Sequence, residues 1–250
     1  MITDFINKDI PFLFVKFGDG EYNAANRVKG NNCDNDSYTE RLGDGILQAI
    51  QYTSLTPNAY CGCWHTGTVP DFFNSVVSGK INWVDYHICI LDNHTFENQK
   101  KFLLFQAIQQ SKRKKVLIGN ELLGKAKTLF HMDEHIVVPY NNWFSTDFDN
   151  ILKKTTECYK DDDIPFVITC AGMGSKVLLM ELHKLFPKGI FLDIGSGLDY
   201  VCTKKCSRGW SYSYEQLEAY FRDLLPSNWN DEQFEWIYQK AKTHIGLHLQ

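Results

Sequence analysis

The sequence lacks the long apolar runs, the strong net charge and the biased composition that mark several classes of protein. No segment approaches the roughly 18 apolar residues of a membrane-spanning helix, and the 250 residues include only 7 prolines. Lys and Arg number 26 against 30 Asp and Glu, a formal net charge of −4, which gives no basic excess of the kind that attracts nucleic acid. Membrane-spanning, fibrous and nucleic-acid-binding proteins are therefore disfavoured.

The chain also shows no secretion signal and no disulfide framework. Asp4 and Asp9 stand where a signal peptide would carry positive charge, so we expect a cytoplasmic protein. The 8 cysteines are scattered through a chain that is long enough to fold without disulfide bonds, so we expect free thiols. Cys61-x-Cys63 with His65 lacks the paired spacing of a structural zinc site.

Short apolar runs alternate with segments of helical period. This alternation predicts parallel strands joined by helices, hence an α/β fold with a Rossmann-like, doubly wound, mostly parallel sheet. In such a sheet, ligands bind at the carboxyl ends of the strands. We expect strands at 12–17, 59–63, 87–91, 115–118, 136–138, 166–170 and 190–193, and helices at about 37–50, 96–110, 121–130, 144–158 and 175–186.

The alternation ends after about residue 200. Two amphipathic helical patterns follow, the first opening at Ser213-x-x-Gln216 and closing at Pro226. We therefore expect one domain over residues 1–250, with an α/β core over about 1–205 and a C-terminal helical extension over about 206–250.

The sharpest local pattern is Phe17-Gly18-Asp19-Gly20-Glu21, directly after the first expected strand. The glycines allow a ligand to approach the backbone closely. If the segment is extended, Asp19 and Glu21 point to the same side and could hold Mg²⁺ or Mn²⁺; alternatively, these acids cap a helix N-terminus. The tripeptide recurs at Gly43-Asp44-Gly45 within a helical period, where we expect a structural role.

Two further glycine-containing loops follow expected strands. In the first, Gly172, Gly174 and Ser175 precede a helix, so they fit either phosphate binding at a helix N-terminus or close packing between strand and helix. In the second, Gly195 and Ser196 follow Asp193-Ile194. This second loop looks like the Asp-x-Gly-x-Gly loop of S-adenosylmethionine-dependent methyltransferases, but it lies near the end of the α/β alternation rather than after the first strand.

Taken together, the three loops resemble the GT-D type glycosyltransferases, a family with a Rossmann-like fold that transfers a sugar from a nucleotide donor. The family signature Arg-Phe-Gly-Asp-Gly-Glu corresponds to Lys16-Phe17-Gly18-Asp19-Gly20-Glu21. Lys16 keeps the positive charge of the arginine but lacks the planar guanidinium that can bind two oxygens at once. Pro139-Tyr140-Asn141-Asn142-Trp143-Phe144 resembles the Pro-x-x-Asn-x-Phe stretch of the family, and Asp193-Ile194-Gly195 resembles its Asp-x-Gly strand end.

The resemblance implies a metal-dependent hexosyl- or pentosyltransferase that moves a sugar from a nucleotide-diphosphate sugar, with a UDP-sugar as the first expectation, to a glycan or other hydroxyl acceptor. It implies Mn²⁺ or Mg²⁺ bound by Asp19 and Glu21. The expected donor contacts are Lys16, Phe17, Gly18, Gly20, Asn142, Gly172, Gly174, Ser175, Gly195 and Ser196.

An inverting enzyme needs a group that takes the proton of the acceptor hydroxyl. Asp199 and His65, each next to an expected strand end, are the candidates. Two other functions stay open: a methyltransferase that uses the loop at Gly195, and a non-catalytic module that binds nucleotide sugars or glycans.

Overall fold

The computed structural model describes residues 1–63, 67–85, 98–160, 163–198 and 202. These residues contain one 7-stranded sheet in the order β3-β2-β1-β7-β6-β4-β5, and every neighbouring pair of strands is parallel. The strands are β1 (Phe12–Lys16), β2 (Ala59–Cys63), β3 (Trp83–Asp85), β4 (Lys114–Gly119), β5 (Glu134–Val137), β6 (Pro165–Cys170) and β7 (Ile190–Asp193).

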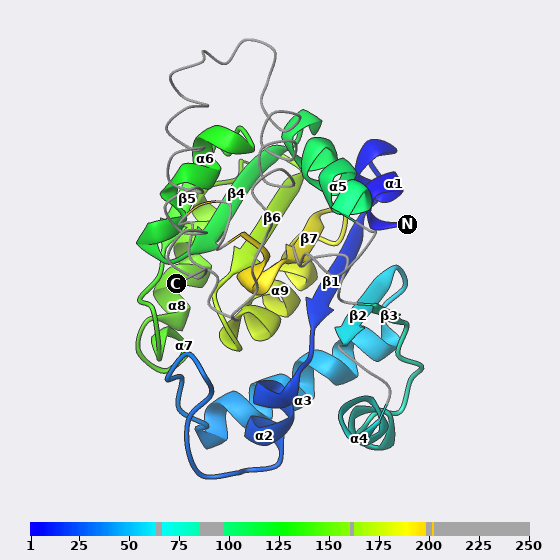
Figure 1. The fold of residues 1–250 in the computed structure, drawn as a ribbon, viewed down its shortest axis with the longest axis vertical. Coiled ribbons are helices and arrows are strands. Elements are labelled where there is room, and N and C mark those ends of the chain that lie inside the picture. The colour runs from blue at the N-terminus through cyan, green and yellow to red at the C-terminus, as the bar shows by residue number, and fades with distance from the viewer. Residues whose placement is uncertain (64–66, 86–97, 161–162, 199–201, 203–250) are drawn as a thin grey trace, which may run out of the picture.

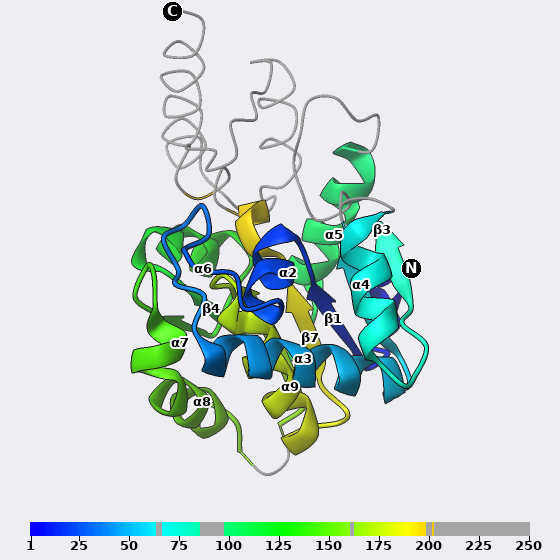
Figure 2. The same cartoon turned by 90° about the horizontal axis from the view of Figure 1, so that it is seen from below.

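Helices cover both faces of this sheet (Figures 1 and 2). The α-helices are α1 (Ile2–Asn7), α2 (Asp19–Ala25), α3 (Glu40–Leu55), α4 (Thr68–Val76), α5 (Asn98–Gln110), α6 (Lys125–Leu129), α7 (Trp143–Thr146), α8 (Phe148–Glu157) and α9 (Gly174–Leu185). The described residues also include the short 3₁₀ helices η2 (Glu121–Gly124) and η3 (Gly195–Leu198). None of the helices within the described ranges is both long enough and apolar enough to cross a bilayer.

Alternating side chains of the strands divide the core into two layers. Phe12 and Phe14 of β1 pack with α1, α5, α6 and η3 on one face of the sheet. Leu13 and Val15 pack with α2, α3, α4, α7, α8 and α9 on the other face. Because successive side chains of a strand point to opposite faces, a strand buried on both sides reads as a continuous apolar run. The expected doubly wound, Rossmann-like α/β fold is confirmed.

The helical boundaries differ from expectation in several places. Helix α3 begins after Thr39, whose Oγ1 accepts from the N–H of Leu42 at 3.2 Å, rather than at Ser37. The expected helix over 144–158 is two helices that meet at Asp147, and the one over 121–130 begins as a 3₁₀ turn. Helices α1 and α4 had not been expected. The expected strand at 87–91 and the helical extension over 206–250 lie outside the described residues.

The topology places a crevice at the carboxyl ends of the central strands. From β1 the chain passes to α2 and α3, which pack on one face, whereas from β7 it passes to η3 on the opposite face. Since β1 and β7 are neighbours, the two connections diverge between them. Such a divergence is a topological switch point, where doubly wound sheets bind their ligands.

Candidate active site

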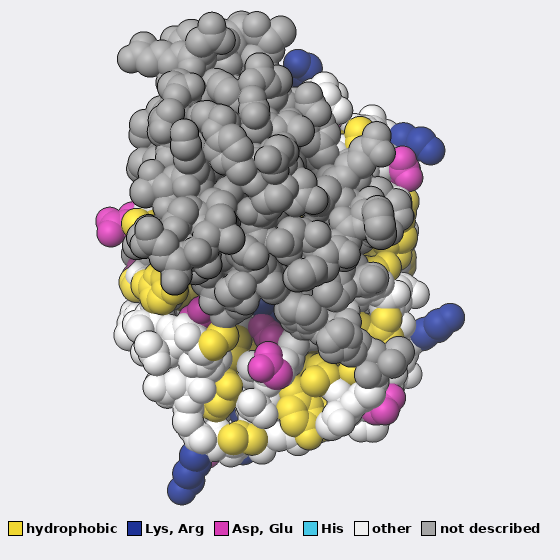
Figure 3. Space-filling model, viewed as in Figure 1, with side chains coloured by type: hydrophobic (Ala, Val, Ile, Leu, Met, Phe, Trp, Pro, Cys, Tyr) yellow, Lys and Arg dark blue, Asp and Glu magenta, His cyan; other side chains and the backbone are white. Residues whose placement is uncertain are grey.

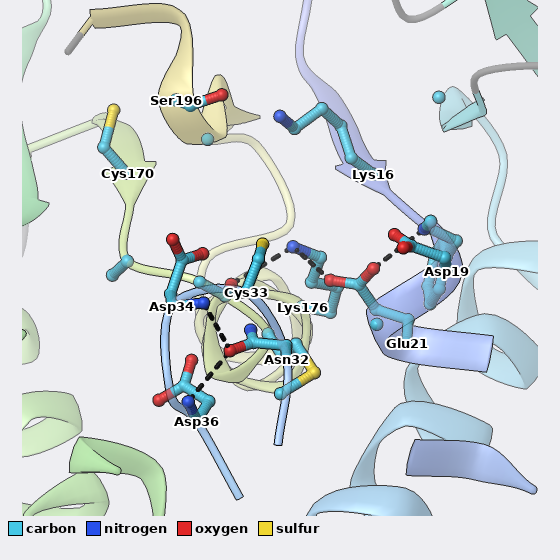
Figure 4. Close-up of a pocket in the computed structure, with 18 of the residues that line it drawn as sticks. Lys16, Asp19, Glu21, Asn32, Cys33, Asp34, Asp36, Cys170, Lys176 and Ser196 are labelled. Atoms are coloured by element: carbon cyan, nitrogen blue, oxygen red, sulfur yellow. Dashed lines mark hydrogen bonds and ion pairs between the residues drawn. The ribbon is translucent and has the colours of Figure 1, made fainter. Parts of the chain in front are cut away.

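A cavity of about 790 Å³ lies at this switch point. Its walls come from the turn between β1 and α2, the loop over 31–36, and the segments that follow β2, β5, β6 and β7. Figure 3 shows acidic side chains gathered near the middle of this face, among polar and apolar atoms, and Figure 4 shows the residues inside. The size suits a ligand as large as a nucleotide.

Lys176, in the first turn of α9, lies at the floor of the cavity (Figure 4). Its side chain is 5% exposed, and its Nζ lies 2.9 Å from Glu21 Oε1 and 3.0 Å from Asp193 Oδ2. Nζ also donates to the carbonyl of Gly172 at 3.1 Å. Burial opposes the charge, but the carboxylates of Asp193 and Glu21 outweigh it and raise the pKa of Lys176, so the ammonium stays charged.

The two carboxylates that hold Lys176 also bind backbone N–H groups. Glu21 Oε2 accepts from the N–H of Gly18 at 2.8 Å, which caps the start of α2. Asp193, whose side chain is fully buried, accepts from the N–H of Lys16 at 3.2 Å and from that of Gly195 at 3.1 Å. The ends of β1, β6 and β7 are thus tied together through one buried ion cluster.

Asp19 occupies a different environment. Helix α2 begins at Asp19, so of the two alternatives the acids at a helix N-terminus are observed and the extended segment is not. Asp19 lines the cavity and is exposed. Within the part of the chain that the structure describes, its carboxylate makes no hydrogen bond and no ion pair. Both acids of the motif line the cavity, but Glu21 is buried and caps the helix, whereas Asp19 is exposed.

The loop over 31–36 forms the opposite wall and was not expected from the sequence. Asn32 Oδ1 accepts from the N–H groups of Asp34 and Asp36 at 2.9 and 2.8 Å. Figure 4 shows Asp34 and Asp36 on one side of Lys176 and Asp19 on the other. Burial raises the pKa of Asp36, and a hydrogen bond from the N–H of Asn142 opposes that rise.

Asn142 anchors this loop through hydrogen bonds. Its N–H donates to Asp36 Oδ1 at 2.6 Å, and its Oδ1 accepts from the N–H of Ser37 at 2.9 Å. Asn142 is not among the residues that line the cavity. A direct contact between Asn142 and a nucleotide therefore stays a prediction, whereas its contact with the loop is observed.

Most of the expected donor-binding residues line the cavity. The glycines at two of its edges have left-handed backbones: φ is +65° at Gly172 and +57° at Gly195. A side chain at Gly172 would meet Asp36, and one at Gly195 would meet the ammonium of Lys16. The expected residues that line the cavity are Lys16, Phe17, Gly18, Asp19, Gly20, Glu21, Gly172, Gly195 and Ser196.

Gly174 and Ser175 lie beneath the cavity wall instead. A Cβ at Gly174 would lie 2.8 Å from the Trp143 ring, so this glycine allows close packing of α9. The indole of Trp143 is buried, and its Nε1 donates to the carbonyl of Ala171 at 2.8 Å. Ser175 is fully buried. The catalytic candidates His65 and Asp199 lie outside the described residues.

The cavity offers few protein ligands for a divalent cation. In the described ranges, no three or more His, Cys, Asp or Glu side chains form a group that could hold a metal ion. Both oxygens of Glu21 already have partners, whereas Asp19 is open to the cavity. Mg²⁺ commonly binds one or two carboxylates together with water and substrate phosphates. The residues therefore fit a cation shared between Asp19 and a phosphorylated ligand, rather than one enclosed by protein.

No family model matches the chain, and no curated protein matches it. Two solved structures match it. One, at a TM-score of 0.57 and 16% identity, covers 94% of this chain and 91% of the other, and is described as the highly conserved domain of unknown function 1792 with a distinct glycosyltransferase fold. The second, at a TM-score of 0.58 and 16% identity, is the selenomethionine-substituted structure of a domain of the same description. The chain thus has a glycosyltransferase fold of this type.

Proposed function

We propose that the protein is a metal-dependent glycosyltransferase that moves a sugar from a nucleoside diphosphate sugar to a glycan hydroxyl or a similar acceptor. The observation that carries this proposal is the cavity at the switch point, where Asp19 and Lys16 lie beside the loops at Gly172 and Gly195. The glycosyltransferase fold of the similar structures supports it. The resemblance of the Lys16–Glu21 segment to the GT-D signature makes UDP-sugars the first donors to test.

The donor diphosphate fits between Lys16 and Asp19. Lys16 Nζ donates to the carbonyl of Ile194 at 3.0 Å, which holds the ammonium at the cavity edge beside Gly195 and Ser196. An ammonium attracts phosphate as a point charge. Tyr140, 58% exposed at the cavity rim, offers an aromatic face on which a base or sugar ring could stack.

Asp19 would hold Mn²⁺ or Mg²⁺ together with oxygens of the diphosphate. A divalent cation bound there supplies positive charge against the negative charge that develops on the departing nucleotide. Lys16 contributes to the same stabilisation from the other side of the diphosphate. Gly18 and Gly20 leave the backbone open beside Asp19, so the ligand can approach the start of α2 closely.

The acceptor fits against the wall over 31–36. Asp34 lines this wall, and its carboxylate points into the cavity (Figure 4). A carboxylate in this place could take the proton of the acceptor hydroxyl, as an inverting transfer requires. Asp34 joins Asp199 and His65 as a candidate for that role.

Ligand binding tests the proposal first. The full chain is heated with UDP-, GDP- and dTDP-sugars and with S-adenosylmethionine, each with and without Mn²⁺, and its Tm is recorded. A donor at about 100 times its Kd should raise the Tm by about 5 °C, and only in the presence of Mn²⁺. A shift with S-adenosylmethionine alone would instead support a methyltransferase.

Measurement of turnover tests whether the protein catalyses transfer of the sugar. Release of the nucleoside diphosphate from the donor identified by the Tm screen is followed with water and with a panel of glycans as acceptors. A glycosyltransferase should release nucleotide faster with a suitable glycan than with water. Tight binding without any release in the presence of Mn²⁺ would support the non-catalytic binding module.

A further inference from the structure

We propose that Lys176 is a positioning residue that engages Glu21, so that Asp19 alone of the Asp-x-Glu motif binds the cation. This inference rests on the proposed function, because the cation and the donor are the ligands of that same site. It assigns different roles to the two acids of the motif, whereas the resemblance to GT-D enzymes implies a shared one.

The contacts of the Lys176 ammonium are complete. A lysine has three N–H donors, and these meet Glu21 Oε1 at 2.9 Å, Asp193 Oδ2 at 3.0 Å and the carbonyl of Gly172 at 3.1 Å. The three partners belong to the first turn of α2, the end of β7 and the loop after β6. Lys176 therefore fixes these three segments relative to one another.

The carboxylate oxygens around Lys176 are also all engaged. The second oxygen of Glu21 accepts from the N–H of Gly18, and those of Asp193 accept from the N–H groups of Gly195 and Lys16. Each carboxylate oxygen can accept more than one contact, but a cation at Glu21 would lie close to the buried Lys176 ammonium, whose like charge repels it. If the cation instead displaced the ammonium or the capping hydrogen bond, a buried charge or donor would lose its partner, which is unfavourable.

Burial and partners separate the two acids. Asp19 and Glu21 are the first and third residues of α2, and both line the cavity. Glu21 is 8% exposed and holds the Lys176 ammonium, whereas Asp19 is exposed. By holding the N–H of Gly18, Glu21 fixes the start of α2 and so aims Asp19 at the ligand.

Direct cation binding tests the separation of roles. Binding of Mn²⁺ to the full chain in the presence of UDP is measured by electron paramagnetic resonance or calorimetry for Asp19→Asn and Glu21→Gln. We expect Asp19→Asn to weaken Mn²⁺ binding at least about tenfold and Glu21→Gln to weaken it less than about threefold. If Glu21→Gln weakens binding as much as Asp19→Asn, the inference is overturned.

The role of Lys176 is tested by a double-mutant cycle. Lys176→Met, Glu21→Gln and the double variant are compared by their kcat/KM for the donor, well below the Tm of each, with Lys184→Met as a control from the exposed end of α9. If Lys176 acts through Glu21, the effects are strongly non-additive, and kcat falls at least about tenfold in each single variant while the donor KM changes less than about threefold. Additive effects, or a kcat within twofold of the native value in Lys176→Met, would contradict the inference.

Two further results keep the test decisive. Should Lys176→Met not fold, Lys176→Arg, which keeps the charge, is measured in the cycle instead, and the binding comparison of Asp19 with Glu21 stands independently. If the native chain binds neither Mn²⁺ nor UDP, the proposed function itself fails. A native chain that binds both, with equal losses in Asp19→Asn and Glu21→Gln, overturns only the separation of roles.

Discussion

The tripeptide Gly-Asp-Gly occurs twice in the chain, and its two copies have different surroundings. Gly18-Asp19-Gly20 follows β1 and begins α2 at the cavity. Gly43-Asp44-Gly45 lies inside α3, away from the cavity. The same three residues thus open one helix and pack within another, and what distinguishes the copies is the buried strand that precedes the first.

The second copy lies where α3 packs against the helices that contain Asp19 and Lys176. A Cβ at Gly43 would lie 2.4 Å from the carbonyl oxygen of Ala24, in α2, and one at Gly45 would lie 2.8 Å from Val177 of α9. Asp44 is exposed and pairs with Arg27, just after α2. The structural role expected for this copy is confirmed: its glycines let α3 pack closely against the two helices that carry Asp19 and Lys176.

The largest expected difference between the copies is in turnover. Asp19→Asn should lower kcat/KM at least about 100-fold, because a carboxylate that holds a charge-stabilising cation contributes several kcal/mol to the transition state. Asp44→Asn, the matched change, should alter kcat/KM less than twofold. Steady-state kinetics with donor, acceptor and Mn²⁺ measure both values. Similar losses in the two variants would remove the functional contrast between the copies.

The next difference is in stability. Gly43→Ala should lower the free energy of unfolding by about 2 kcal/mol, since the added Cβ would overlap a backbone carbonyl and force the helices apart. Gly20→Ala should change it by less than about 1 kcal/mol, because its nearest neighbour is the flexible Met173 Sδ at 3.3 Å and alanine favours a helix. Urea unfolding measures both; a larger loss in Gly20→Ala would contradict the assignment.

The smallest expected effect is that of the Asp44–Arg27 ion pair. Its side chains are 60% and 40% exposed, and solvent-exposed pairs contribute at most about 1 kcal/mol. Asp44→Ala should therefore lower the free energy of unfolding by no more than that amount, and by less at 1 M salt, where screening is stronger. A loss that persists unchanged in high salt would show that Asp44 contributes by something other than its charge.

Much of the fold was predictable because buried parallel strands are short, apolar and β-branched. Strands such as β4 and β6 lie within one residue of their expected bounds. The strand order was not predictable, because periodicity reports burial and not which strands pair. Helix α4 was missed because Pro70 and the neighbouring polar residues obscure its period, although proline is well tolerated in the first turn of a helix.

The candidate site was predictable where glycine and acidic residues cluster after a strand, as at Asp19 and Gly195. Lys176 was missed because a lone lysine in a helix is usually solvated. A signal for it existed: at helical spacing it shares a face with Leu179, Met180 and His183, which are all buried. A charged residue on an apolar face indicates a buried partner, and here there are two.

The loop over 31–36 had no such signal, because its residues are ordinary turn formers and its anchor, Asn142, is more than 100 residues away in the sequence. That anchor means the cavity wall is shaped by contacts formed as the chain folds rather than by the arriving ligand. A wall built in advance loses little conformational freedom on binding, so more of the contact energy is retained as affinity. It also couples the shape of the cavity to folding, since a change that loosens the start of α7 removes the anchor of the loop over 31–36.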